Sequence, residues 1–271
     1  MKIKEKDLCI ITDFDDTLTK GILDNGKRGS NSFSVFPNNP KLLGKEYVEL
    51  TNKYFKYYYN LEQNPKLNHK EKSKLMKEWW EKEFELYKKY GLNKTTLQKV
   101  IEDKLIELKD KVHEFLELTN KFKIPVVIFS AGIYDLIHGF LRKIEADYDN
   151  VHVVANIFKF DKEEKFIGTK GEIIHSQNKT FEELSHLPIY SELKNKYSCL
   201  LLGDSLGDLK MIEGSKFKYV KKIGFLNKLP SENGYGERLK AHKDRYDIVI
   251  DGRENFTKVN NILKEILIEN D

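Results

Sequence analysis

The chain has 271 residues, of which 33% are charged and 39% hydrophobic, and its net charge is +4. This length suits one large domain or a core with an inserted second domain, and the small basic excess fits phosphorylated ligands but not a nucleic-acid polymer. No apolar run approaches the roughly 20 residues of a membrane-spanning helix, and residues 1–7 do not resemble a signal peptide. We therefore expect a monomeric cytoplasmic protein that binds no membrane and keeps Cys9 and Cys199 as buried thiols.

The first predicted strand leads directly into a group of acidic residues. The apolar run that begins at Leu8 is typical of a buried parallel strand, and Asp13, Asp15 and Thr17 follow its carboxyl end, where open α/β sheets bind ligands. Side chains alternate along an extended backbone, so Asp13 and Asp15 can leave the strand on the same side. Two carboxylates that close repel each other unless a cation or a shared proton relieves them. The pattern predicts bound Mg²⁺, or one acid kept neutral, or both.

The next segments predict a loop and then a helical domain. Residues 21–34, here called the flap, are rich in turn residues and form either a mobile flap beside the acids or an ordinary surface loop. The spacing of apolar residues then becomes helical. Four helices are expected: one with an apolar face from Leu43 to Tyr58, one from a cap at Asn68 to Gly91, one that opens at Thr95 or Thr96, and one over Lys111–Phe122. Most of the aromatic residues are expected in the core of this bundle.

Strands and helices alternate after Lys123, which indicates a parallel sheet with helices on both faces. Strands are expected at 124–129, 151–155, 158–160, 165–167, 198–202, 219–223 and 247–250, with 158–160 and 165–167 forming a hairpin. Helices are expected at 134–144 and 256–268. The predicted fold is therefore α/β, with a Rossmann-like core formed by residues 1–34 and 123–271. A helical cap domain formed by residues 35–122 is inserted after the first strand.

Two further strand ends carry small and oxygen-bearing residues. In Phe129–Ile133, a serine, an alanine and a glycine at a strand-to-helix junction can expose backbone N–H groups to an anion, although this motif taken alone favours Ser130 as a helix cap. In Leu202–Asp208, Asp204 occupies the position of a strand-end metal ligand, and Asp208 lies one helical turn further on. Because the carboxyl ends of parallel strands meet at one sheet edge, we expect these residues to lie near Asp13 and Asp15.

This set of motifs resembles the haloacid dehalogenase (HAD) superfamily. Within it, Ile11–Thr19, Phe129–Ile133, Lys170–Lys179 and Leu202–Met211 are similar to the cytosolic pyrimidine 5′-nucleotidase family, and the similarity spans nearly the whole chain. Two residues depart from the family pattern: Tyr134 stands where a glycine is expected, and Asp16 stands where relatives often carry an apolar residue.

The resemblance implies a set of roles for the phosphate site. Asp13 would be the nucleophile that forms an aspartyl phosphate, and Asp15 the general acid and base. Mg²⁺ would be held by Asp13, by the backbone carbonyl of Asp15 and by Asp204. Residues that would bind the phosphate are Ser130, Ala131, Gly132 and Lys179, and residues that would support the site are Thr17, Ser205 and Asp208.

The resemblance also implies a substrate. Glu62 would face the base, and of the neighbours Trp79 and Trp80 one is expected in the core while the other stacks on the base. The predicted reaction is the Mg²⁺-dependent hydrolysis of nucleoside 5′-monophosphates, with UMP and CMP preferred. The alternatives are a 7-methylguanosine-phosphate nucleotidase, which would use cation–π stacking, a phosphatase for another small ester such as phosphoserine, and a non-catalytic nucleotide-binding module.

Overall fold

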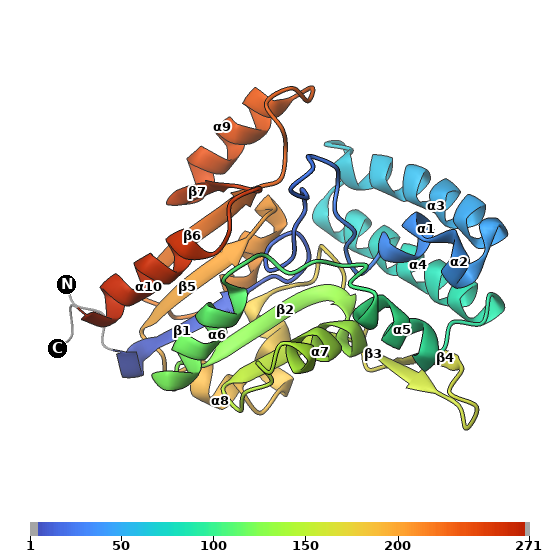
Figure 1. The fold of residues 1–271 in the computed structure, drawn as a ribbon. Helices are drawn as coiled ribbons and strands as arrows, with labels where there is room; N and C mark the ends of the chain where they lie inside the picture. Colours follow the sequence, from blue (N-terminus) through green and yellow to red (C-terminus); the bar gives the residue numbers. More distant parts are fainter. Residues whose placement is uncertain (1–4, 269–271) are drawn as a thin grey trace.

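A seven-stranded sheet forms the centre of the computed structural model, which describes residues 5–268 (Figure 1). The strands are β1 (Leu8–Thr12), β2 (Val126–Ile133), β3 (Val151–Phe160), β4 (Phe166–Lys170), β5 (Ser198–Gly203), β6 (Tyr219–Leu226) and β7 (Ile248–Asp251). They lie in the order β4-β3-β2-β1-β5-β6-β7, and every neighbouring pair is parallel except β3 and β4. The predicted α/β class is confirmed, and β1 lies in the middle of the sheet.

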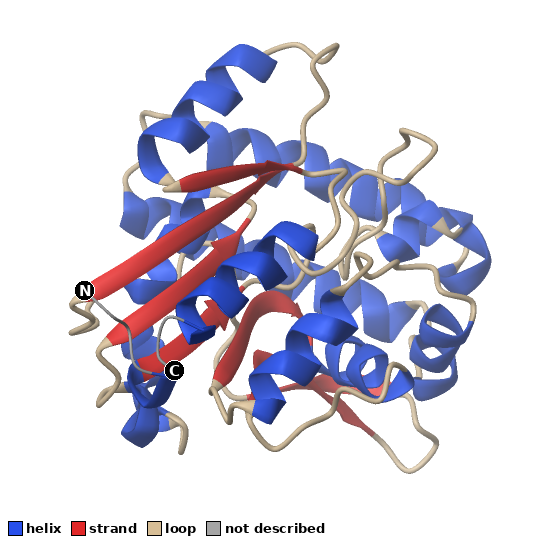
Figure 2. Ribbon diagram, turned by 60° about the vertical axis from the view of Figure 1, so that its left-hand side comes forward, coloured by secondary structure: helices blue, strands red, loops and turns tan. Residues whose placement is uncertain are grey.

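Both faces of the sheet are covered by helices, because the central strand is apolar on both sides (Figure 2). Ile10 faces a hydrophobic cluster shared with three helices, whereas Cys9 and Ile11 face a second cluster on the other side. On the first face lie α6 (Val112–Lys121), α7 (Tyr134–Lys143) and α10 (Thr257–Ile268). On the second lie the 3₁₀ helices η2 (Phe181–His186) and η3 (Leu206–Ile212) and the short helix α8 (Tyr190–Leu193). Cys9 and Cys199 are buried free thiols, as predicted.

The inserted segment after β1 is helical. Its helices are α1 (Val35–Asn38), α2 (Pro40–Leu43), α3 (Lys45–Gln63), α4 (His69–Lys89) and α5 (Lys94–Glu102). Asn68 caps α4 as predicted: its side chain accepts from the Glu71 N–H, and the Glu71 carboxylate accepts from the Asn68 N–H. The two long helices pack together around a buried carboxylate, since Glu83 accepts hydrogen bonds from Tyr47 (2.5 Å) and Thr51 (2.8 Å). This shared network fixes α3 against α4.

The structure differs from the sequence-based expectation in several elements. The third cap helix is capped by Asn93 rather than by a threonine. β3 is one long strand where two short ones were expected, and β2 runs through Ser130 to Ile133 with a change of register against β3. Ser130 therefore does not cap α7, whose N-cap residue is Ile133. The irregular register aims residues 130–132 toward the end of the sheet.

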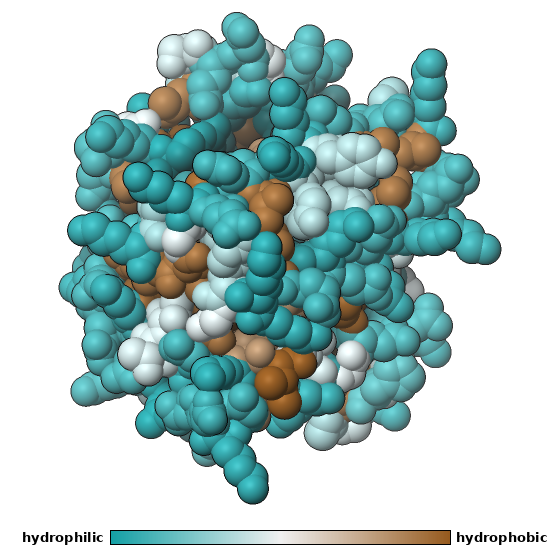
Figure 3. Space-filling view, turned by 90° about the vertical axis from the view of Figure 1, so that its right-hand side faces the viewer, coloured by the Kyte–Doolittle hydropathy of each residue, from teal (hydrophilic) through white to brown (hydrophobic). Residues whose placement is uncertain are grey.

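Packing places part of the predicted cap with the core. α6 lies against α10, and the rings of Phe115 and Phe256 are 5.3 Å apart. The helix α9 (Tyr235–Arg245) was not predicted; it contacts β6 and β7 at the edge of the sheet. No helix among the described residues is long and apolar enough to span a bilayer. The face nearest the cap is mostly hydrophilic with scattered hydrophobic spots (Figure 3).

Candidate active site

Three adjacent strands bring the predicted acidic residues together at their carboxyl ends. β1 lies between β2 and β5. Asp13, Ser130 and Asp204 therefore lie next to one another at the edge of the sheet where these strands end. Here a cavity of about 180 Å³, the catalytic cavity, is lined by Asp13, Asp15, Asp16, Ser130, Ala131, Ser176, Lys179, Asp204, Ser205 and Asp208. The fold therefore gathers most of the predicted site residues, whose roles stay predictions.

Lys179 joins two buried carboxylates in this cavity. Its Nζ donates to Asp13 Oδ1 (2.5 Å) and to Asp208 Oδ1 (2.9 Å). Burial raises the pKa of Asp13 to about 8, although Lys179 opposes this shift. Burial also raises the pKa of Asp208, but Lys179 outweighs it and holds that pKa below its usual value. Burial alone would lower the pKa of Lys179, and the two carboxylates raise it above its usual value, so the ammonium stays charged.

Asp208 also shapes the turn that presents Asp204. Its Oδ2 accepts from the N–H groups of Asp204 (3.1 Å) and Ser205 (2.9 Å) and from the Ser205 hydroxyl (2.9 Å). A Cβ at Gly203 would lie 2.5 Å from the Asp208 Cβ, so this close approach requires a glycine. Ser205 and Asp208 thus hold the loop from which the Asp204 side chain enters the cavity.

Asp15 is held by the flap. Its Oδ1 accepts hydrogen bonds from the Ser32 N–H (2.8 Å) and the Ser32 hydroxyl (2.9 Å). Burial raises the pKa of Asp15 to about 6, and the bonds from Ser32 oppose the shift. A Cβ at Gly132 would lie 2.4 Å from Ser32 Oγ, so only glycine lets the flap approach here. Asp15 is therefore positioned as a carboxyl group that gains and loses a proton near neutral pH.

The acidic group fits a divalent cation. Carboxylate oxygens of Asp13, Asp204 and Asp208 all lie within 4.8 Å of one another. Burial, with the nearby Asp208, raises the pKa of Asp204 well above its usual value. Hard oxygen ligands of this kind suit Mg²⁺. The Asp15 carboxylate bonds to Ser32, and the role of the Asp15 backbone carbonyl as a metal ligand stays a prediction.

Two side chains, one on α9 and one directly after it, hold the backbone of the Asp204 loop. His242 Nε2 lies 2.9 Å from the Asp204 carbonyl oxygen, and the Tyr246 hydroxyl donates to the Ser205 carbonyl oxygen at 2.5 Å. Both side chains are buried. Consecutive carbonyl groups are thus fixed from outside the loop, which restricts the direction in which the Asp204 side chain points.

Replacing Tyr246 with phenylalanine is expected to weaken Mg²⁺ binding about tenfold, because groups that orient a metal ligand affect metal affinity by about 10- to 100-fold. The Tyr246→Phe substitution keeps the ring and removes the bond to the Ser205 carbonyl. Calorimetric titration with Mg²⁺ measures the effect. Tyr235→Phe, which removes a hydroxyl from the first residue of α9, serves as the control. Equal Mg²⁺ affinity in both variants and the parent protein would mean that α9 does not orient Asp204.

A second cavity, of about 360 Å³, lies between the cap and the core and is here called the aromatic cavity. It is lined by Asn31, Phe33, Ser34, Phe55, Tyr59, Glu62, Met76, Trp79, Trp80, Ala131, His175 and Ser176. Both Trp79 and Trp80 line this cavity, and Trp80 also packs against the hydrophobic core, as expected of one of the two. Phe33 of the flap contacts both, with ring centroids 5.2 Å from Trp79 and 6.0 Å from Trp80, so the cavity wall curves around two adjacent side chains.

Glu62 faces the aromatic cavity and contacts the core. Its carboxylate accepts a short hydrogen bond from the Ser176 hydroxyl and a longer one, of 3.4 Å, from the Gln177 side chain. His69 Nε2 lies 2.8 Å from the Gln177 carbonyl oxygen. The loop that carries Ser176 and Gln177 continues to Lys179, so the same segment contacts the aromatic cavity and the catalytic cavity.

Two other residues singled out in the sequence lie apart from the ligand cavities. Thr17 is buried, and its hydroxyl has no hydrogen-bond partner in the described part of the chain. Tyr134 stacks on His138 with the centroids 5.4 Å apart and does not narrow the cavity beside Ser130.

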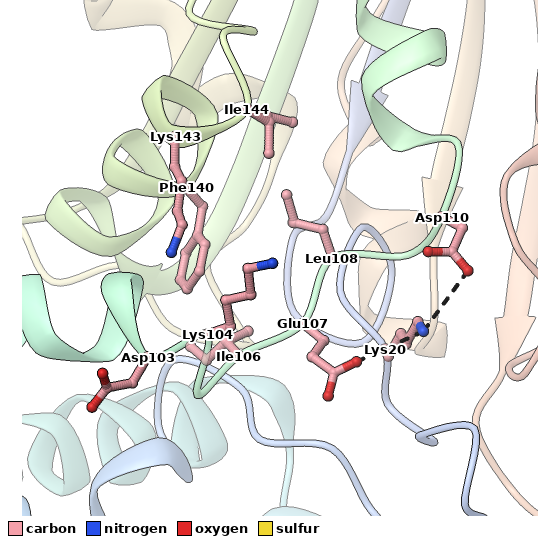
Figure 4. A pocket seen from close by; sticks show the side chains of 10 residues that line it. All are labelled: Lys20, Asp103, Lys104, Ile106, Glu107, Leu108, Asp110, Phe140, Lys143 and Ile144. Carbon is pink, nitrogen blue, oxygen red and sulfur yellow. Dashed lines mark ion pairs between the residues drawn. The ribbon is translucent and has the colours of Figure 1, made fainter.

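A cavity of about 560 Å³ between residues 103–110 and α7 does not resemble a catalytic site (Figure 4). Two of its lysines already have partners. Lys20 pairs with Glu107 (3.7 Å) and Asp110 (3.8 Å), and Lys143 donates to carbonyls at the end of α5. These contacts join the loop after β1 to the core, so we regard this cavity as structural.

The chain is similar to known nucleotidases over almost its whole length. A family model described as pyrimidine 5′-nucleotidase (UMPH-1) matches residues 16–267. The 7-methylguanosine phosphate-specific 5′-nucleotidase of Mus musculus is 32% identical over 265 residues, which cover 97% of this chain and 86% of that protein.

Solved structures agree with this similarity. Cytosolic 5′-nucleotidase IIIB bound to cytidine superposes with a TM-score of 0.84 at 27% identity, covering 98% of this chain and 88% of that one. A phospho-aspartyl intermediate analogue of phosphoserine phosphatase superposes with a TM-score of 0.57 at 20% identity, covering 98% and 99%. The second match shows a shared fold.

Proposed function

The chain belongs to the pyrimidine 5′-nucleotidase family, and we propose that it hydrolyses nucleoside 5′-monophosphates to nucleoside and phosphate with Mg²⁺. It is thus an enzyme of the 5′-nucleotidase class with the HAD fold. The observation that carries the specific proposal is the junction of two cavities. The catalytic cavity with Asp13 and the aromatic cavity with Glu62 share Ala131 and Ser176, which suits a phosphate joined to a base.

The phosphate end uses the residues of the catalytic cavity. Asp13 attacks the phosphorus atom and forms an aspartyl phosphate, while Asp15, with a pKa near 6, protonates the departing 5′-oxygen. Asp15 then accepts a proton from the water that hydrolyses the intermediate. Lys179 donates to the phosphoryl oxygens, together with Ser130 and the nearby backbone N–H groups. When bound by Asp13 and Asp204, Mg²⁺ supplies positive charge beside these oxygens.

The base end favours rings that present hydrogen-bond donors. A carboxylate accepts but does not donate, so Glu62 suits the amino group of cytosine or the adjacent N–H groups of guanine better than uracil, whose N–H lies between two carbonyl oxygens. Aromatic faces on Phe33, Trp79 and Trp80 also attract a cationic ring. CMP and 7-methyl-GMP are therefore the proposed substrates, in line with relatives named for 7-methylguanosine phosphate and a neighbour bound to cytidine. UMP, which the sequence predicted as a preferred substrate together with CMP, is expected to be hydrolysed less well than CMP because uracil offers Glu62 no amino group.

The function is tested by measuring phosphate release, with Mg²⁺ or with EDTA, from six compounds: CMP, UMP, GMP, 7-methyl-GMP, ribose 5-phosphate and phosphoserine. We expect EDTA to abolish release, and Glu62→Gln to raise KM for CMP and 7-methyl-GMP by about 10- to 100-fold, since a charged hydrogen bond contributes about 1.5–3 kcal/mol. KM for ribose 5-phosphate, which has no base, should not change. Release from phosphoserine alone would exclude a nucleotide substrate, and no release from any ester would favour a binding module.

We also propose that the protein acts as a monomer in the cytoplasm. The similarity to a protein named cytosolic 5′-nucleotidase supports the location. Sedimentation of the purified protein measures its oligomeric state.

A further inference from the structure

A third cavity, of about 480 Å³, opens beside the two that take the phosphate and the base in the proposed complex. It is lined by Asp16, Arg28, Asn31, Phe55, Tyr59, Asp204, Asn227, Lys228 and Arg238 and is here called the cationic cavity. These residues come from the loop after β1, the flap, α3, the segment after β6, and α9. Figure 1 shows α3 and α9 on the same side of the molecule with the flap between them. The proposed reaction uses no basic residue of this cavity.

The three cavities adjoin one another in pairs. The catalytic and aromatic cavities share Ala131 and Ser176, the aromatic and cationic cavities share Asn31, Phe55 and Tyr59, and the catalytic and cationic cavities share Asp16 and Asp204. A nucleotide with its phosphate in the first cavity and its base in the second must place its ribose where they meet. The 2′- and 3′-oxygens, on the ribose edge away from the 5′-phosphate, are then directed toward the third cavity.

Two of the three basic side chains of the cationic cavity are held in no ion pair with the described residues. Arg28 is paired with Glu232 at 2.8 Å and donates to the Asn227 carbonyl at 2.5 Å. Among the described residues 5–268, Lys228 and Arg238 make no side-chain hydrogen bond and no ion pair, although Arg238 lowers the pKa of Asp204 and Lys228 lowers that of Glu232 through their charge. Asp16 and Asp204, the acids of this cavity, also line the catalytic cavity. An anion in the cationic cavity would therefore meet two cations whose N–H groups are free to donate.

We propose that this cavity binds a second phosphate carried on the ribose, so that nucleoside 2′,5′- or 3′,5′-bisphosphates are substrates. This inference rests on the proposed nucleotidase function. The reaction consumes one water molecule and breaks the bond between phosphorus and the 5′-oxygen. The 5′-oxygen takes a proton, the phosphoryl group ends as inorganic phosphate, and the phosphate on the 2′- or 3′-oxygen is retained. Lys228 and Arg238 are specificity-determining residues for this second phosphate.

The test compares cytidine 5′-monophosphate with cytidine 2′,5′- and 3′,5′-bisphosphate. We expect KM for one of the bisphosphates to be about tenfold lower than for the monophosphate, because a charged hydrogen bond contributes at least about that factor. Lys228→Gln and Arg238→Gln should each remove most of this gain and leave kcat and KM for the monophosphate within about twofold. Lys243→Gln is the matched control, since it removes one charge from the exposed surface of α9.

Binding is measured separately from turnover, so that the two proposals can fail independently. Calorimetric titration of the Asp13→Asn variant with each ligand gives dissociation constants without hydrolysis. Tighter binding of a bisphosphate that is lost in Lys228→Gln supports the subsite, even if the parent protein hydrolyses none of the three compounds. Equal binding and equal KM for all three compounds would overturn it. An equal effect of Lys228→Gln and Lys243→Gln would also overturn it, since it would show only a change in overall charge.

Discussion

Replacing Asp13 with asparagine should lower kcat for nucleoside monophosphates by about 10⁴-fold or more, because loss of a nucleophile removes the covalent route altogether. The Asp13→Asn side chain has nearly the same shape, and Lys179 keeps its second partner, Asp208, at 2.9 Å. The fold and the cavities should therefore survive. The amide is a poor nucleophile and a weaker ligand for Mg²⁺, so the chemical step and the metal site are both affected.

A nucleophile is identified when its substitution lowers kcat but leaves nucleotide binding nearly unchanged, so the two are measured separately for Asp13→Asn. Stopped-flow phosphate release gives kcat, and calorimetry gives the nucleotide affinity, which should change by less than about tenfold. Asp24→Asn makes the same substitution on the exposed flap, where Asp24 pairs with Lys20, and should leave kcat nearly unchanged. Residual turnover within tenfold of the parent protein would exclude Asp13 as the nucleophile.

The parts of the site predictable from the sequence follow from topology. Asp13 and Asp204 each come directly after a buried strand, Ser130 lies near the end of another, and adjacent parallel strands end at the same edge of a sheet. Local pattern was enough to place them together. Lys179 had no such signal, since it lies in an irregular loop in a lysine-rich chain, and only the resemblance to a family singled it out.

The residues that sequence reasoning missed act through tertiary contacts. Ser32 reaches Asp15 from a turn-rich flap, and Ser176 reaches Glu62 across the boundary between cap and core, so neither has a periodic signal. His242 lies on a helix that was not predicted, and Tyr246 follows its last residue. His242 is its one buried residue among Tyr235–Arg245, so the segment lacks the apolar spacing that marks a helix. Their function becomes visible only when α9 is placed beside the Asp204 loop.

Replacing Lys179 with methionine should lower both activity and stability. The substitution leaves Asp13 and Asp208 buried without their cation, and removal of one partner from a buried ion pair costs about 3–5 kcal/mol. Without Mg²⁺, we expect the free energy of unfolding to fall by that order at pH 7. Activity with Mg²⁺ should fall by about 10²- to 10³-fold, the cost of losing one group that stabilises the transition state.

The pH dependence shows whether the lost stability comes from charge. Lys179 holds the pKa of Asp208 below its value in the unfolded chain, which is about 3.9. The pair therefore stabilises the parent protein above about pH 3.9, and this stabilisation is lost as the pH falls through the folded pKa of Asp208. The Lys179→Met variant lacks this stabilisation. The difference between parent and variant, measured by urea unfolding, should therefore be larger at pH 7 than near pH 3.5, and Mg²⁺ should narrow it at pH 7.

A second buried lysine provides the control for this experiment. Lys109 donates to the backbone carbonyls of Gly252 and Glu254, which do not titrate, and burial lowers its pKa to about 8. Burial sets the pKa shift of Lys109, and the nearby Asp16, Asp251 and Asp204 only oppose it, so the cost of Lys109→Met should change less between pH 7 and 3.5 than the cost of Lys179→Met. A cost of Lys179→Met that changed no more than that of Lys109→Met would mean that packing of the lysine chain, and not its bridge between Asp13 and Asp208, holds the site together.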